Sequence, residues 1–107
     1  LVSVIYISSS TCKDCYDVHI NKRILEGNFG MTLASETFVN NTDHAGAEYI
    51  AKYKIEKLPV ILVSPEAKDY AGFVAAWKSV GDVADDGWYV MRKPEVIGKI
   101  DLIGHVV

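Results

Sequence analysis

The sequence has few cysteines, few prolines and little net charge: two, three and −3 in 107 residues. Two cysteines are too few for a disulfide scaffold, and they fit a reducing or an oxidising compartment equally well. Acidic and basic residues are interspersed, so we expect neither a nucleic acid nor an anionic membrane surface as partner. No apolar run approaches the roughly 20 residues that a membrane-spanning helix needs, so we also expect no span.

What the sequence does have is a high apolar content. Half of the residues are hydrophobic, which suffices for one core but not for two in a chain of this length. We therefore expect a single domain over residues 1–107, and a monomer. The chain begins without Met and enters the apolar run "VSVIYIS" almost at once. This start suggests that a leader, an anchor or a neighbouring domain has been removed, and hence an extracytoplasmic or membrane-anchored location.

Strand-like and helix-like segments alternate along the chain. β-branched and aromatic residues favour strands, an apolar stripe with helical spacing favours helices, and glycines and "NNTD" separate them. The alternation predicts an α/β fold with a central mixed sheet flanked by helices. The predicted strands are residues 2–8, 31–39, 60–63 and 88–92, with one more in the tail 94–107. The predicted helices begin near Cys12, after Asp43, where Ala47, Ile50 and Ala51 should point inward, and at residues 70–80, where Trp77 belongs to the core.

Both cysteines lie in "STCKDC", directly after the first strand. Thr11 and Asp14 resemble a capping box, so we expect the first helix to begin near Cys12, with Tyr16 on its apolar stripe. Cys12 would then face the positive end of the helix dipole, which favours the thiolate, whereas Cys15 would be shielded one turn deeper. This asymmetry predicts that Cys12 attacks a substrate disulfide and that Cys15 resolves the mixed disulfide.

Neighbouring side chains adjust this chemistry weakly. Lys13 favours the Cys12 thiolate, Asp14 opposes it, and His19 is either solvated helix surface or a nearby titrating group. The sequence leaves three interpretations of the pair open: a redox centre, which we favour, a local structural disulfide, or part of a metal site. A metal would need His19 and then His44 or His105, none at a diagnostic spacing. We therefore expect no metal and no cofactor.

The surroundings of the pair resemble the thioredoxin superfamily. The resemblance covers residues 2–64: a strand, Cys-x-x-Cys, a second strand and helix, and then "AKYKIEKLPVIL". It implies a thioredoxin-like fold with a cis peptide bond before Pro59. The backbone of Leu58 would then hydrogen-bond an extended protein substrate. It also implies a helical insertion between the third and fourth strands, where the family usually has a tight hairpin.

Two positions depart from the thioredoxins proper, which have a carboxylate six residues before the first cysteine and an aromatic residue just before it. This chain has Tyr6 and Thr11 there. Two functions are therefore expected as competitors. The first is a thiol–disulfide oxidoreductase that acts on protein thiols and disulfides. The second is a non-enzymatic thioredoxin-fold module of a larger protein, which binds a partner through the Pro59 edge or the inserted helix.

Overall fold

A computed structural model describes residues 1–102 and contains a mixed five-stranded sheet. The strand order is β2-β1-β4-β6-β5, with β1 parallel to β2 and antiparallel to β4. β6 is antiparallel to both β4 and β5. The strands are β1 (Val2–Ser8), β2 (Leu33–Asn40), β4 (Val60–Val63), β5 (Gly81–Val83) and β6 (Tyr89–Met91). The predicted α/β class with a mixed sheet is confirmed.

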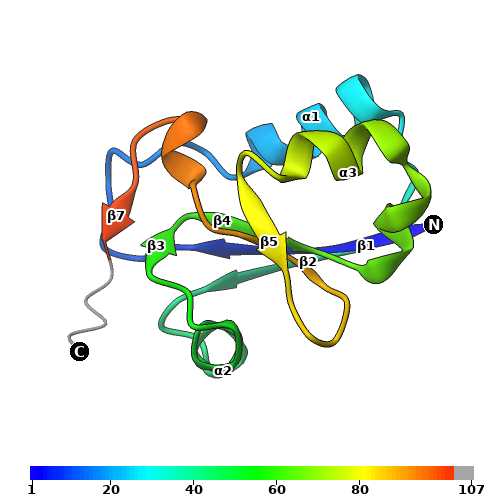
Figure 1. The fold of residues 1–107 in the computed structure, drawn as a ribbon. Coiled ribbons are helices and arrows are strands. Elements are labelled where there is room, and N and C mark those ends of the chain that lie inside the picture. The colour runs from blue at the N-terminus through cyan, green and yellow to red at the C-terminus, as the bar shows by residue number, and fades with distance from the viewer. Residues whose placement is uncertain (103–107) are drawn as a thin grey trace.

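Helices cover both faces of this sheet. α1 (His19–Phe29) and α3 (Ala71–Trp77) lie on one face and α2 (His44–Tyr53) lies on the other (Figure 1). Because β1 and β4 are central and covered on both sides, their runs are apolar almost throughout, and all four residues of β4 are buried. Short 3₁₀ turns occupy Pro65–Asp69 and Pro94–Val96. Within residues 1–102, no helix has the length and apolarity to cross a membrane.

The predicted helix between the third and fourth predicted strands is present as α3. Its buried residues are Phe73 and Trp77, and the Phe73 ring contacts Phe29 of α1 and Tyr89 of β6. Trp77 is buried, which confirms its assignment to the core. Its indole N–H donates to the Asp82 carbonyl over 3.1 Å. The short strand β5, which follows α3 and pairs with β6, was not predicted.

The predicted start of the first helix is wrong. α1 begins at His19, and both cysteines precede it in a loop of residues 9–18, which we call the cysteine loop. The residue that holds the helix start is Asp17, whose carboxylate accepts the His19 backbone N–H over 3.0 Å. The helix therefore begins after Asp17 and not at the Thr11 and Asp14 pattern. Tyr16 lies in the loop rather than on the helix. Asn21 and Leu25 form the buried stripe of α1 instead.

Two further predictions need correction. α2 begins after Asp43 as expected, but its buried residues are Gly46 and Tyr53, whereas Ala47 and Ala51 are exposed and Ile50 is half-buried. The tail forms the turn Pro94–Val96 and then only the two-residue strand β7 (Asp101–Leu102). β7 pairs antiparallel with β3 (Lys57–Leu58) in a separate small ladder. The rest of the predicted tail strand, residues 103–107, lies outside the described residues.

Candidate functional site

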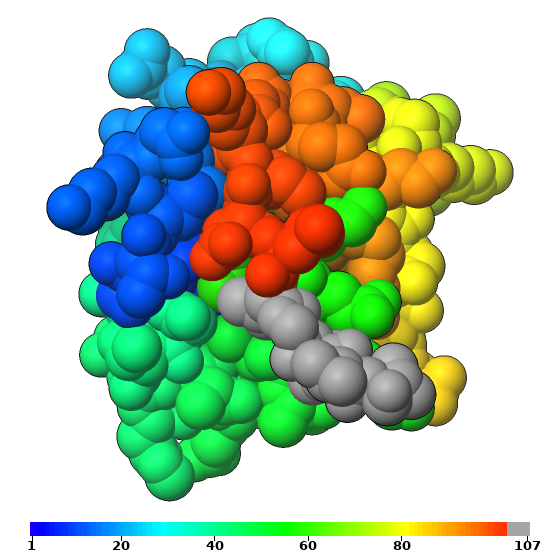
Figure 2. All heavy atoms as spheres, turned by 90° about the vertical axis from the view of Figure 1, so that its left-hand side faces the viewer, coloured from blue at the N-terminus to red at the C-terminus, as the bar shows by residue number. Residues whose placement is uncertain are grey.

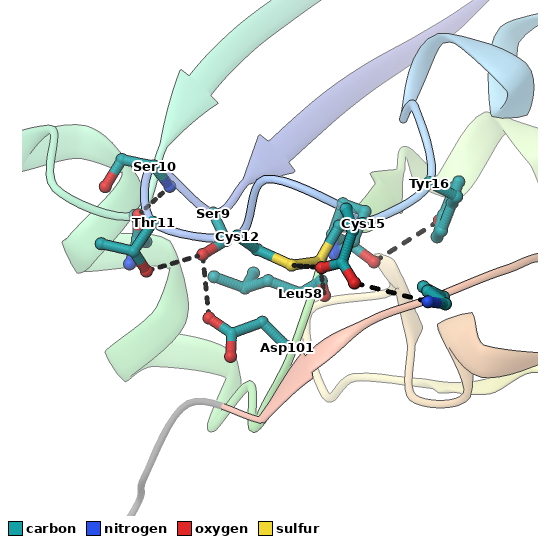
Figure 3. Close-up of a disulfide and its surroundings, with 12 residues drawn as sticks. Ser9, Ser10, Thr11, Cys12, Cys15, Tyr16, Leu58 and Asp101 are labelled. Carbon is teal, nitrogen blue, oxygen red and sulfur yellow. Dashed lines mark hydrogen bonds and ion pairs between the residues drawn. A yellow bond between two sulfur atoms is a disulfide. The ribbon is translucent and has the colours of Figure 1, made fainter.

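The cysteine loop carries a disulfide between Cys12 and Cys15, whose Cα atoms are 5.6 Å apart (Figure 3). Both cysteines are half-buried, so the expected contrast between an exposed Cys12 and a shielded Cys15 is not found. The loop is held at both ends. The Ser10 N–H donates to the Asn41 side-chain oxygen over 2.9 Å, and the Tyr16 N–H donates to the Lys99 carbonyl over 2.9 Å.

A cis-proline turn lies against the disulfide. The Leu58–Pro59 peptide bond is cis, as the resemblance implied, and both residues are buried. The Leu58 carbonyl oxygen lies 3.9 Å from Cys15 Sγ. The chain thus brings together two segments that are 43 residues apart in sequence and places the substrate-binding residues of our prediction beside the cysteines.

A small hollow of about 140 Å³ opens over these sulfurs. Its walls come from the end of β1, the cysteine loop, the start of α1 and the cis-proline turn. The lining residues are Ser8, Ser9, Cys12, Cys15, Tyr16, Asp17, Val18, His19 and Pro59. The hollow therefore collects Cys12, Cys15, Pro59 and His19 from the predicted set, and the exposed Lys13 and Asp14 do not line it.

Charged groups border Cys12 on its outer side. Asp14 Oδ1 lies 3.7 Å from Cys12 Sγ, and Asp14 Oδ2 forms an ion pair with Lys99 Nζ at 3.4 Å. Both side chains are 75% exposed, so solvent screens the pair strongly. Because α1 starts only at His19, its dipole does not act on Cys12 in the predicted way. Asp14, with its partner Lys99, is therefore the charged neighbour that the Cys12 thiol would have after reduction.

His19 is held in place although it is exposed. Its Nδ1 lies 2.7 Å from Asp17 Oδ1, and its ring stacks on Phe38 with 4.8 Å between centroids. The hydrogen bond from the His19 backbone N–H, reinforced by the one from its ring, lowers the pKa of Asp17. His19 therefore stands on the wall of the hollow, with one ring nitrogen engaged by Asp17 and its ring held against Phe38.

Tyr16 is a site residue that the sequence reasoning assigned to the wrong element. Its hydroxyl donates to Asn21 Oδ1 over 3.0 Å and lies 3.4 Å from the Pro59 carbonyl. Burial raises the pKa of Tyr16, which keeps the hydroxyl protonated at neutral pH. Tyr16 thus ties the cysteine loop to α1 and to the cis-proline turn. The available signal was an aromatic residue placed directly after the second cysteine.

The structure also bears on the metal interpretation. Among residues 1–102, no group of three or more histidine, cysteine, aspartate or glutamate side chains is arranged to hold a metal ion. His44 lies on α2 and pairs with Glu48, and His105 lies outside the described residues.

Comparisons with known proteins add no relative. No family model matches the chain, and the searches of curated proteins and of solved structures found no match. The functional interpretation therefore depends on the chemistry of the site itself.

Proposed function

We propose that this chain is a thioredoxin-like thiol–disulfide oxidoreductase that exchanges disulfides with protein substrates through Cys12 and Cys15. The observation that carries the proposal is the position of the disulfide, half-buried beside the Leu58 carbonyl at a cis-proline turn. A purely structural disulfide across three residues would stabilise little beyond its own loop and would not require a substrate edge beside it.

The order of the elements supports the resemblance on which this proposal draws. β1 leads into the cysteine loop and α1, β2 leads into α2, and the cis-proline turn opens β4. A 3₁₀ turn and α3 follow β4, at the position where the resemblance implied a helical insertion. A mixed sheet with helices on both faces is common to many folds and does not by itself indicate the thioredoxin-like fold. The support for the resemblance comes from the positions of the two cysteines and Pro59 within this order of elements.

The proposed exchange conserves electrons and atoms. In the reduced protein, the Cys12 thiolate attacks one sulfur of a substrate disulfide, and the other substrate sulfur leaves as a thiolate. The Cys15 thiolate then attacks Cys12 Sγ, which reforms the Cys12–Cys15 disulfide and releases the second substrate thiolate. Two electrons pass to the substrate, and the released thiolates take up the two protons lost by the cysteines. The reverse sequence oxidises a substrate dithiol.

The surroundings of the two sulfurs favour this assignment of roles. Cys15 Sγ faces the carbonyl of the fully buried Leu58, whereas Cys12 Sγ faces the exposed Asp14 side chain. Although both cysteines are half-buried, the neighbour of Cys12 is a solvent-exposed side chain and that of Cys15 is a buried backbone carbonyl, so we assign the attack on the substrate to Cys12.

Turnover and trapping test the proposal. We expect the protein to catalyse reduction of a peptide disulfide by dithiothreitol, and Cys12→Ser to abolish this catalysis. When reduced Cys15→Ser is mixed with the peptide disulfide after dithiothreitol has been removed, it should accumulate a mixed disulfide that is visible by mass spectrometry. Undiminished turnover by Cys12→Ser would contradict the proposal. A reduction potential below about −300 mV would also oppose it, because structural disulfides typically lie there.

The competing function is a non-enzymatic binding module, and one observation favours it: α1 begins four residues after Cys15, which removes the expected helix-dipole activation of Cys12. The two functions differ in one result. For a binding module, replacing both cysteines by serine would leave partner binding unchanged, whereas the oxidoreductase would lose covalent capture of its substrate.

A further inference from the structure

The last described residues of the chain lie directly on the candidate site. Residues 98–102, which we call the strap, pass between the cysteine loop and β3. On one side the Lys99 carbonyl accepts the Tyr16 N–H over 2.9 Å. On the other side Asp101 pairs with Leu58, and Leu102 pairs with Lys57. In Figure 2 the orange-red surface of this region lies between the blue cysteine loop and green residues that precede β4.

Polar side chains fasten the strap to the site. Ser9 donates its hydroxyl to Asp101 Oδ2 over 2.9 Å, as Figure 3 shows. Lys99 forms its ion pair with Asp14, the residue whose carboxylate lies beside Cys12. Glu95, three residues before the strap, is tied to β3 by Lys57, whose Nζ lies 2.7 Å from Glu95 Oε2. This hydrogen bond is the main cause of the lowered pKa of Glu95. The strap thus contacts both the loop and the edge that flank the disulfide.

These contacts occupy the edge that an extended substrate would need. A peptide that adds to a strand edge does so through main-chain hydrogen bonds, with side-chain contacts providing selectivity. β3 ends at Leu58, directly before the cis-proline turn, and β7 already lies against it. A substrate strand and the strap therefore compete for the same backbone at Leu58.

No residue of the strap is fully buried. Leu102 is 72% exposed, Lys99 is 75% exposed at its side chain, and the β3–β7 ladder contains two residue pairs. A segment with little buried apolar surface opens at a low free-energy cost compared with the core. The core strands beneath it, by contrast, are fully buried at Val60 and Leu62.

We propose that the strap is an intramolecular occupant of the peptide-docking edge, which an extended segment of a protein substrate must displace to pair with Leu58 beside the disulfide. The strap contacts also define the peptide that fits best: one that carries a basic residue two positions before an acidic residue. The basic side chain would take the place of Lys99 against Asp14, and the acidic one that of Asp101 against Ser9. This inference rests on the proposed function for the identity of the β3 edge as the docking site.

A substitution at Gly98 should open the strap without changing a charge. A Cβ at Gly98 would lie 2.6 Å from the Cβ of Tyr16, which is closer than real side chains approach. Tyr16 cannot move aside easily because its hydroxyl is bonded to Asn21. Gly98→Ala should therefore push the strap off the cysteine loop. Gly27→Ala is the matched control, because a Cβ there has no neighbour within 4 Å.

The probe is a synthetic peptide with the sequence of residues 95–102, EVIGKIDL, added to the folded chain of residues 1–107. NMR shifts of the Lys57 and Leu58 amides report binding at the β3 edge. We expect Gly98→Ala to bind the peptide about tenfold more tightly than the native and Gly27→Ala chains, because apparent affinity scales with the fraction of molecules whose edge is free. The charge-exchanged peptide EVIGDIKL should bind Gly98→Ala more weakly than EVIGKIDL.

A second variant guards against misfolding. Asp101→Ala removes the hydrogen bond from Ser9 without adding bulk, and it should raise the peptide affinity in the same direction as Gly98→Ala. Equal binding by all chains, or binding by none, would overturn the strap proposal. Because this experiment measures binding without turnover, it can succeed or fail independently of the Cys12→Ser test for the oxidoreductase.

Discussion

The hydroxyl of Tyr6 donates a 2.7 Å hydrogen bond to Glu36 Oε1 across the pair of strands β1 and β2. Tyr6 stands six residues before Cys12, where the thioredoxins that this chain resembles have a carboxylate. Here the carboxylate belongs to β2 and is bound to the phenol and to Lys22, whose Nζ lies 3.2 Å from Glu36 Oε2. Burial, reinforced by Glu36, raises the pKa of Tyr6. Tyr6 thus stays protonated and cannot replace that carboxylate as a proton acceptor for Cys15.

This hydrogen bond predicts a specific loss of stability. Glu36→Ala leaves the hydroxyl of the fully buried Tyr6 without its acceptor, so we expect the free energy of unfolding to fall by about 1–3 kcal/mol. Urea denaturation of both single variants and of Tyr6→Phe/Glu36→Ala measures the coupling. In the Tyr6→Phe background the same substitution should cost clearly less. An equal cost in both backgrounds would show that the contact contributes nothing.

Glu36 also predicts how stability depends on pH. Burial alone would raise its pKa, but the hydrogen bonds from Tyr6 and Lys22, aided by the charges of Lys22 and His19, outweigh burial and lower the pKa below 4.5. A folded-state pKa below the unfolded value stabilises the protein above the unfolded pKa, and this contribution is lost as the pH falls through the folded pKa. Thermal unfolding between about pH 5 and pH 3 should therefore lose stability less steeply in Glu36→Gln than in the native chain. Parallel curves would contradict this prediction.

Asp14 predicts the direction in which the reactivity of reduced Cys12 can be changed. Its carboxylate lies 3.7 Å from Cys12 Sγ, and a nearby anion disfavours the thiolate. Asp14→Asn should speed alkylation of reduced Cys12 by iodoacetamide at pH 7, by up to about fivefold because the site is exposed.

Lys99 provides the control for this experiment. Lys99→Gln breaks the same ion pair but removes a cation instead of an anion, so it should slow alkylation. If both variants speed alkylation, opening of the strap rather than charge controls the reactivity of Cys12.

The sequence predicted the core strands well because their signal is local. Val60 to Val63 form a continuous apolar run, and such a run is typical of a central strand that is buried on both faces of a sheet. The burial of Phe73 and Trp77 was predicted equally well, because their helical spacing matches the apolar face of a helix. The cis peptide bond at Pro59 followed from the resemblance together with the spacing from Cys15.

The cysteine loop was mispredicted because distant residues determine its shape. Thr11 and Asp14 satisfy a local capping pattern, but Asn41 and Lys99 bind the Ser10 and Tyr16 backbone from other parts of the chain. The contacts of the strap with Leu58 and Ser9 span 43 and 92 positions, and no short-range pattern encodes such pairs. The cysteines and Pro59 could therefore be identified from the sequence, whereas the contacts of the strap could not.

α3 should contribute strongly to the stability of the fold through Phe73. Phe73 is 1% exposed, and its ring centroid lies 5.0 Å from that of Trp77 and 5.1 Å from that of Tyr89. Phe73→Ala should lower the free energy of unfolding by about 3–5 kcal/mol, as for other buried aromatic residues. The exposed Ala75→Ser on the same helix serves as the control, with an expected change within about 0.5 kcal/mol. A small loss in Phe73→Ala would mean that α3 is a separable surface element.

Two helical glycines should respond in opposite directions to the same substitution. A Cβ at Gly46 would overlap the Asn40 carbonyl oxygen, and Asn40 cannot retreat because Asp43 bonds both its N–H and its carbonyl. Gly46→Ala should therefore lower the free energy of unfolding by about 1–3 kcal/mol. Gly27→Ala in α1 meets no neighbour within 4 Å and should raise it by about 0.4–1 kcal/mol.

The Gly46 substitution should also reach the disulfide. Asn41, next to the residue that Gly46→Ala displaces, accepts the Ser10 N–H and so holds the start of the cysteine loop. Hydrogen exchange of the Ser10 amide should be faster in Gly46→Ala than in the native chain and unchanged in Gly27→Ala, because only the first substitution strains this anchor. Equal exchange in the three proteins would show that the end of β2 adapts without moving Asn41, and that the cysteine loop is positioned from the Tyr16 side alone.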